Sequence, residues 1–240
     1  MSLLQASQIN LSSANSSVTN WVLIKNVRVI FACLAGTLAF FTDTQLEPIF
    51  SQRLEEFNMS TFQIGLMFTL IPATYIPSML LIPLVRVEKR IILIVSAFLL
   101  GVATFLNGPS EVFHMPDVLY LIMMGQAFSG IFIACLSIPA LPEMINASSA
   151  RFDKTEEHRV HSLCSGLYNA SLGLGQTLGP ILSSALYAAF GFRVTQDIIG
   201  FTCIFYAIIY LLFGLGFKSC RRVEKDSLTQ ELVPKTSISN

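Results

Sequence analysis

The chain has 240 residues, of which 53% are hydrophobic and only 12% are charged. Soluble globular domains carry about 25% charged residues, and half of that supply cannot cover the surface of a soluble fold of this size. With a mean hydropathy of +0.64 and 15 basic residues against 15 acidic ones, the composition argues against a soluble enzyme, a disordered regulator and a nucleic-acid-binding protein, and it favours a polytopic membrane protein.

Six apolar runs follow one another along the chain. They cover roughly residues 27–50, 62–84, 91–107, 118–140, 162–190 and 197–217. A helix of about 20 residues crosses the hydrocarbon core of a bilayer, whereas barrel strands would alternate apolar and polar residues over about 10 positions. These runs are apolar on every side. The sequence therefore predicts an all-α, polytopic membrane protein whose residues 27–217 form a bundle of six transmembrane helices.

The segments on either side of the bundle are polar. Residues 1–26 are rich in Ser and Asn, and we interpret them as a cytosolic tail or the remnant of a linker. Residues 218–240 are expected to form a disordered cytosolic tail.

The basic residues indicate an orientation. The two terminal tails and the connections after the second and fourth runs hold 13 of the 15 Lys and Arg residues, and the other connections hold only Arg53 and Arg193. Basic residues concentrate in cytoplasmic loops. The split therefore predicts that both termini lie in the cytosol. It also supports the count of six spans, because an odd number of spans would not give this alternation.

The first run contains two acidic residues, Asp43 and Glu47, which are four apart and share one helix face. Ionisable groups at membrane depth are costly and usually mark a solute or proton pathway. No basic residue elsewhere in the apolar runs can neutralise them, while Thr44 and Gln45 add hydrogen-bond donors nearby. A carboxyl that binds either a proton or a cation suits proton-coupled cation transport. The alternative is that one of the two is hydrated near the non-cytoplasmic headgroups.

The fourth run ends in Ser137-Ile-Pro139-Ala-Leu-Pro142-Glu143. Two prolines three apart open the helix and free backbone carbonyls. Glu143 is then either a gate or hinge carboxylate that binds a loop arginine such as Arg151 or a helix end, or a solvated carboxylate at the interface.

The fifth run carries small and amide residues. Gly175 and Gly179 form a GxxxG pattern, which lets two helices approach closely. Asn169 and Gln176 are seven apart and lie on about the same helix face. They could line a polar cavity, or each could make a hydrogen bond to another helix.

Five motifs of the chain now form a recognisable set: Leu46-Glu47-Pro48, Gln63–Leu66, Arg86–Arg90, Ser137–Glu143 and Gly175–Pro180. Together they resemble the vesicular amine branch of the major facilitator superfamily, most closely the C-terminal half of the vesicular polyamine transporters. The Arg86–Arg90 segment is similar to a degraded basic loop motif, without its Gly and Asp. The resemblance extends from about residue 27 to 217.

This resemblance implies one half of the superfamily fold, built of two inverted three-helix repeats. It implies a proton-coupled antiporter that moves a cationic amine or polyamine into an acidic vesicle, with Glu47 as the cation or proton carboxylate. The expected site comprises Glu47, Asp43, Asn169 and Gln176 at the substrate and proton pathway, and Glu143, Pro139, Pro142, Gly175, Gly179 and Pro180 as gates or hinges.

Other expectations concern the partners of the chain. They are a small cationic solute, protons, the lipid bilayer and a second six-helix half, without nucleic acid, metal, cofactor or enzymatic activity. The monoamine members have acidic residues near the positions of Ala134 and Asn169, which disfavours a monoamine as the solute. The alternative function is a truncated, non-transporting half that binds intact carriers and modulates them.

Overall fold

The computed structural model describes residues 26–85, 87–149 and 157–231, and the side chains of these residues except 157 and 214–231. Within these ranges every regular element is helical, which confirms the predicted all-α class. The elements are α3 (Val27–Thr44), α4 (Glu47–Glu55), α5 (Thr61–Phe68), α6 (Leu70–Leu81), η1 (Ile82–Leu84), α7 (Lys89–Asn107), α8 (Leu119–Ser137), α9 (Ala140–Ser149) and α10 (Glu157–Glu231).

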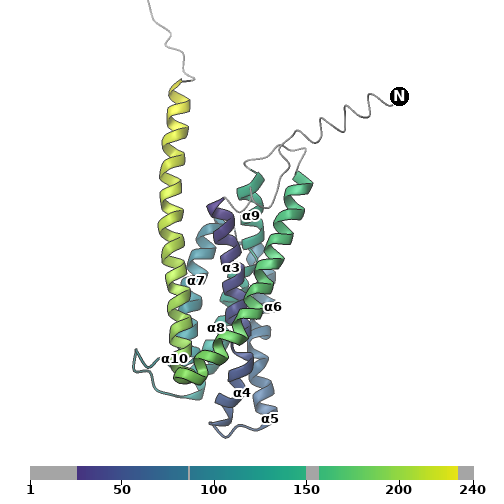
Figure 1. Cartoon of the computed structure of the whole chain (residues 1–240), viewed down its shortest axis with the longest axis vertical. Coiled ribbons are helices and arrows are strands. Elements are labelled where there is room, and N and C mark those ends of the chain that lie inside the picture. Colours follow the sequence, from purple (N-terminus) through teal and green to yellow (C-terminus); the bar gives the residue numbers. More distant parts are fainter. Residues whose placement is uncertain (1–25, 86, 150–156, 232–240) are drawn as a thin grey trace, which may run out of the picture.

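Five stretches of the described helices are long and apolar enough to cross a membrane. They are Val27–Glu55, Thr61–Leu84, Lys89–Asn107, Leu119–Ser149 and His158–Phe213. The last stretch belongs to α10, in which two helices join at Gly191 with φ 79° and ψ 175°. Glycine reaches a positive φ without a steric penalty. Figure 1 shows the two limbs that result, a first limb before Gly191 and a second limb after it. They correspond to the fifth and sixth predicted runs.

Three helical stretches are longer than the sequence suggested. The first reaches Glu55 rather than residue 50, and the fourth reaches Ser149 rather than residue 140. The second limb of α10 continues as a helix to Glu231, so residues 218–231 are helical where a disordered tail was expected. Residues 1–25 and 232–240 lie outside the described part of the chain.

Prolines determine where the long spans break. The first span is interrupted after Thr44, the second after Phe68 and the fourth near Ile138. Pro48, Pro72 and Pro142 follow these positions by four residues. A proline lacks the N–H that would bond the carbonyl four residues earlier, and its ring crowds that carbonyl. Each of these spans therefore consists of two helices, and the chain can bend where they meet.

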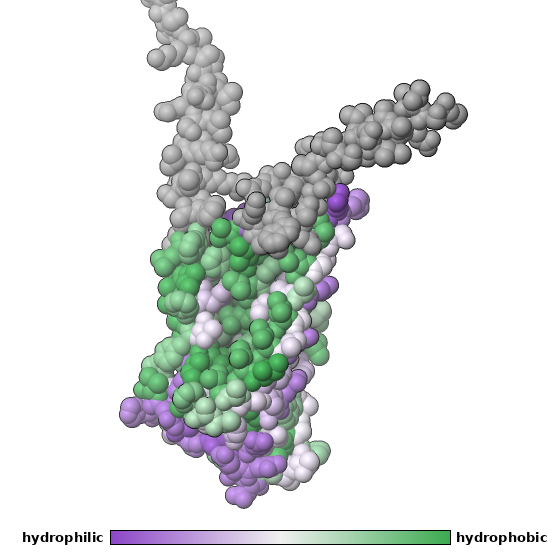
Figure 2. All heavy atoms as spheres, viewed as in Figure 1, coloured by the Kyte–Doolittle hydropathy of each residue, from purple (hydrophilic) through white to green (hydrophobic). Residues whose placement is uncertain are grey.

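The connections alternate between the two ends of the bundle. The α4–α5 turn, the α7–α8 loop and the Gly191 kink lie at one end, which we call the kink end (Figure 1). The start of α3, the start of α7 and the end of α9 lie at the other end, which we call the basic end. The face seen in Figure 2 carries a broad apolar band with hydrophilic residues gathered at the kink end. The assignment of the basic end to the cytosol stays a prediction.

The core is built around α3, which packs against both α8 and α9 and against α10. Its inward face is made of small residues, Ala32, Ala35 and Ala39, all of which are completely buried. Small side chains allow close helix approach where no hydrophobic effect drives association. The second span, Thr61–Leu84, differs from the others because only 6% of its apolar window is buried, against 56% for the first span. One side of the bundle is therefore uncovered.

Candidate functional site

The two acidic residues of the first span lie on either side of its break. Asp43 belongs to the last turn of α3 and is half-buried, while Glu47 opens α4 and is exposed. Neither carboxylate has an ion-pair partner among the described residues. The donors expected beside them are used elsewhere: the Thr44 hydroxyl donates to the Phe40 carbonyl at 2.9 Å, and the Gln45 amide bonds to Gln196. Glu47 and Asp43 are thus open to a cationic ligand or a proton.

The first limb of α10 crosses α3 directly next to this break. A Cβ atom built at Gly175 would lie 2.3 Å from the Thr37 carbonyl oxygen, and one at Gly179 would lie 2.5 Å from Thr44 Oγ1. The Thr37 hydroxyl also donates to the Ser171 carbonyl at 2.9 Å. The GxxxG pattern therefore brings two backbones together beside Asp43, and only glycine fits there.

Replacing Gly175 by Ala is expected to destabilise the protein by about 1–3 kcal/mol, because a backbone carbonyl cannot move aside and the two helices must separate. Gly173 and Gly166 lie in the same limb with no atom within 4 Å of an added Cβ. Alanine at either position is expected to stabilise or leave the protein unchanged, since it raises helix propensity. Thermal melting of the purified protein in detergent measures all three variants. Equal melting temperatures for G175A and G173A would contradict the close crossing.

The amides of the first limb are exposed. No hydrogen bond joins the side chain of Asn169 or of Gln176 to another described residue. The interhelical bond that was the alternative interpretation is therefore not formed within this part of the chain. Pro180 follows one turn later inside the helix without ending it. Because proline has no N–H, it leaves the Gln176 carbonyl without its helical donor.

Glu143 is the central residue of a charged cluster at the basic end. Its side chain is 4% exposed, and Oε1 accepts from Arg28 Nη2 at 2.5 Å and from Arg90 Nε at 3.0 Å. The solvated interpretation of Glu143 is therefore wrong. The described partners are Arg28 and Arg90, and the expected Arg151 lies outside the described residues. The cluster ties the first turns of α3 and α7 to α9.

The proline joint beside Glu143 is held by a neighbouring span. The Ser137 carbonyl at the end of α8 accepts a hydrogen bond of 2.6 Å from the Tyr168 hydroxyl on α10. At the start of α9, the Glu143 N–H donates to the carbonyl of the preceding Pro139 at 3.0 Å. The joint that Pro139 and Pro142 create is thus anchored on one side by the first limb of α10.

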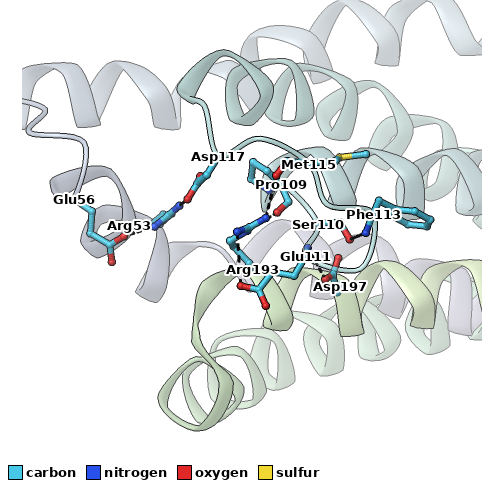
Figure 3. A network of polar contacts seen from close by, with 10 residues as sticks. All are labelled: Arg53, Glu56, Pro109, Ser110, Glu111, Phe113, Met115, Asp117, Arg193 and Asp197. Carbon is cyan, nitrogen blue, oxygen red and sulfur yellow. Dashed lines mark hydrogen bonds and ion pairs between the residues drawn. The ribbon is translucent and has the colours of Figure 1, made fainter.

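A second polar network closes the kink end (Figure 3). Arg53 of α4 forms ion pairs with Glu56 and with Asp117. Arg193, two residues beyond the kink, donates to the Pro109 carbonyl at 2.6 Å and to the Met115 carbonyl at 3.1 Å. These contacts fasten α4 and α10 to the α7–α8 loop.

This network borders an open pocket of about 520 Å³. Its lining residues include Arg53, Arg193, Glu56, Glu111 and Tyr187. Neither Asp43 nor Glu47 lines it. The pocket is therefore a feature of the kink end and is separate from the acidic pair at the α3–α4 break.

The sequence of residues 14–237 matches the Major Facilitator Superfamily along nearly the whole chain. The chain belongs to this superfamily. It is 26% identical over 208 residues to the MFS-type transporter SLC18B1 of Homo sapiens, which covers 85% of the chain and 43% of the relative. The MFS-type transporters SLC18B1 of Mus musculus and Rattus norvegicus are also 26% identical, over 70% and 72% of the chain and 38% of each relative. The chain spans about two fifths of the length of these curated relatives.

Sequence reasoning missed several polar residues of this superfamily member. Arg28 and Arg90 were counted as loop charges, although each bonds a buried carboxylate. Asp197 is 3% exposed and accepts from the Glu111 N–H at 3.2 Å. Asp197 is the first residue of the predicted sixth run, and its place at the run boundary gave no indication that its side chain is buried. Gln45 was treated as a free donor, and its partner Gln196 fell just outside that run.

Proposed function

We propose that this chain forms one six-helix half of a secondary active transporter that exchanges protons for a cationic amine or polyamine across the membrane of an acidic vesicle. The observation that carries the proposal is the pair Asp43 and Glu47, two carboxylates without a cationic partner among the described residues, at a helix break within a membrane span. Acidic residues of this kind are rarely retained in a span unless a solute or proton passes beside them.

The coupling follows from the chemistry of a carboxyl group. The ionised form attracts a protonated amine, and in an apolar setting this attraction is much stronger than in water. The protonated form has no charge and releases the amine. Binding of the proton and the amine to the same group is therefore mutually exclusive. A pH gradient across the membrane then drives the amine toward the acidic compartment.

The uncovered side of the bundle supports a second half as partner. Only 6% of the apolar window of the second span is buried, and Asn169 and Gln176 are exposed on the first limb of α10. In this superfamily the solute site lies between repeats near the bilayer midplane. The chain supplies one wall of such a site, and a second six-helix half supplies the other. The relatives, of which the chain spans about two fifths, have room for both halves.

Alternating access requires contacts that open at one end while closing at the other. Glu143 with Arg28 and Arg90 is the gate at the basic end, which we place in the cytosol. The Pro139 and Pro142 joint and the Gly175, Gly179 and Pro180 segment are the positions at which the spans bend or slide. Breaking the Glu143 cluster frees α9 from α3 and α7.

The second candidate function is a non-transporting half that binds intact carriers and modulates them. One observation favours it: only 6% of the apolar window of the second span is buried, so this span offers a surface to another membrane protein. This alternative uses the same uncovered surface but requires no passage of solute.

Uptake by the longest reading frame that contains this chain tests both functions. The protein is reconstituted in liposomes and offered a panel of radiolabelled monoamines and polyamines, with and without an acidic interior. We expect a polyamine to accumulate at least about tenfold above protein-free liposomes only when the gradient is present, since a gradient of one pH unit supplies about 1.4 kcal/mol per proton.

The control is the same preparation with the gradient collapsed by an ionophore. Accumulation that ignores the gradient contradicts proton coupling, and absence of uptake for every amine contradicts the proposed substrate class. Reduced uptake by an intact carrier on co-reconstitution with this chain would favour the modulatory function.

A further inference from the structure

A buried amide pair lies behind the acidic residues of the first span. Gln45 occupies the turn between α3 and α4, and Gln196 lies in the second limb of α10, 151 residues away. Gln196 Nε2 donates to Gln45 Oε1 at 3.0 Å, and Gln45 Nε2 donates to Gln196 Oε1 at 3.2 Å. Both side chains are completely buried. Each amide is thus donor and acceptor to the other in a closed, uncharged ring.

Gln196 is held in place by contacts of the second limb of α10 with the end of α7 and the α7–α8 loop. A Cβ atom built at Gly108, just after α7, would lie 2.6 Å from Gln196 Cγ, so glycine at this position makes room for the Gln196 side chain. The next residue, Asp197, accepts from the Glu111 N–H and joins the second limb to the α7–α8 loop. The position of the Gln196 amide is therefore set by three separate parts of the chain.

Gln45 is placed midway between the two carboxylates. It lies two residues after Asp43 and two before Glu47, which turns it to the opposite side of a helical segment. The burial agrees, because Gln45 is completely buried while Asp43 is half-buried and Glu47 is exposed. A contact that fixes Gln45 on the buried side of this segment therefore also fixes the orientation of Asp43 and Glu47 on the opposite side.

We propose that Gln45 and Gln196 are positioning residues for transport, whose amide pair fixes the α3–α4 break so that Asp43 and Glu47 face the solute together. This rests on the proposed function. Hydrogen bonds between membrane helices add only about 1 kcal/mol on average, so stability alone gives little reason for the pair. Buried polar pairs are best known for fixing the register of neighbouring helices, and here the register is that of the acidic segment.

In the variant Gln45→Glu, the two hydrogen bonds between residues 45 and 196 depend on pH. A protonated carboxyl donates to the Gln196 carbonyl and accepts from the Gln196 amide, so the ring stays closed. An ionised carboxyl places two acceptors against that carbonyl, and one contact is lost. The other titratable groups nearby are Asp43 and Glu47 on the same segment and Asp197, which follows Gln196 and accepts from the Glu111 N–H. They are common to every variant compared.

The experiment measures uptake of tritiated spermidine into liposomes at several external pH values, for the longest reading frame that contains this chain. Gln45→Glu is expected to match the wild-type KM at low pH and to show a KM raised about tenfold at high pH, which corresponds to one buried acceptor left unpaired. Gln196→Glu should give the same profile. The matched control is Gln52→Glu, which adds the same charge at an exposed position of α4 and should follow the wild type throughout.

A second variant separates positioning from stability. Gln45→Leu with Gln196→Leu replaces the ring by apolar packing, so its melting temperature should stay near that of the wild type while its KM is raised at every pH. A wild-type KM in this variant, or a Gln45→Glu profile equal to that of Gln52→Glu, would overturn the inference.

A readout independent of transport distinguishes failure of the inference from failure of the proposed function. If the wild type takes up no spermidine, the proposed polyamine substrate fails. Positioning is then read by carbodiimide-driven labelling of carboxyls with glycine ethyl ester, followed by mass spectrometry. The labelling of Asp43 relative to Glu55 should change at least about threefold in the double Leu variant, which corresponds to less than 1 kcal/mol. An unchanged ratio would overturn the inference in that case too.

Discussion

Glu47→Gln is expected to abolish proton-driven uptake of the amine while the protein still reaches the membrane in normal amounts. The amide has nearly the shape of the carboxyl, but it neither takes up a proton nor carries a negative charge. Glu47 is exposed at the first turn of α4 and has no ion-pair partner among the described residues, so its replacement leaves no buried charge unpaired. Loss of this charge should reduce the rate by at least about a hundredfold, the range of a single charged contact.

Initial uptake rates in acid-loaded liposomes give the result, and the elution volume in size-exclusion chromatography shows that the variant is folded. Glu55→Gln is the matched control, because Glu55 is an exposed glutamate at the other end of the same helix. Asp43→Asn, measured in parallel, shows whether the half-buried acid shares the role. Wild-type rates for Glu47→Gln would remove Glu47 from the mechanism.

Exchange without a gradient separates the two roles that Glu47 can have. Liposomes filled with unlabelled amine take up labelled amine by counterflow, which requires amine binding but no proton movement. Persistent counterflow in Glu47→Gln would identify Glu47 as the proton carrier alone. Loss of counterflow together with gradient-driven uptake is the result we expect if amine and proton share this carboxyl.

The sequence predicts local features of this bundle well. Apolar length locates the spans, because a membrane helix satisfies its backbone internally and must be about 20 residues long. Proline marks the joints, since the helix before Pro48 ends four residues earlier at Thr44 and the helix before Pro142 ends five residues earlier at Ser137. The GxxxG pattern indicates a close approach, which the structure places between Gly175 and Thr37.

Features that depend on contacts between distant spans could not be predicted in the same way. Glu143 bonds Arg28, which is 115 residues away, and Gln45 bonds Gln196, which is 151 residues away. No periodicity links such positions, because the pairing depends on which helix ends meet in the folded bundle. The kink between the fifth and sixth runs was expected as a connection of several residues, but the chain turns at Gly191 alone, through a backbone conformation that propensity does not reveal.

Glu143→Gln is expected to lower the free energy of unfolding by about 2–3 kcal/mol. The wild-type carboxylate is buried and binds two guanidinium groups whose side chains are 18% and 21% exposed. The amide removes the carboxylate that Arg28 and Arg90 share, and breaking a buried ion pair by removal of one partner typically costs 3–5 kcal/mol. Partial exposure of both arginines places the expected loss below that range. For a chain of this size the melting temperature should fall by about 5–10 °C.

A double-mutant cycle with Arg90→Gln makes this result specific to the cluster. Arg90→Gln alone leaves the pair between Arg28 and Glu143 and should lower the stability by only about 1 kcal/mol. The combination of Glu143→Gln and Arg90→Gln removes one charge of each sign, so its loss should be smaller than the sum of the two single losses by at least about 1 kcal/mol. Melting in detergent at low ionic strength measures all four proteins, with Glu55→Gln as an exposed control. Additive losses would contradict a shared carboxylate at the basic end, and the gate assigned to it would have to lie elsewhere in the bundle.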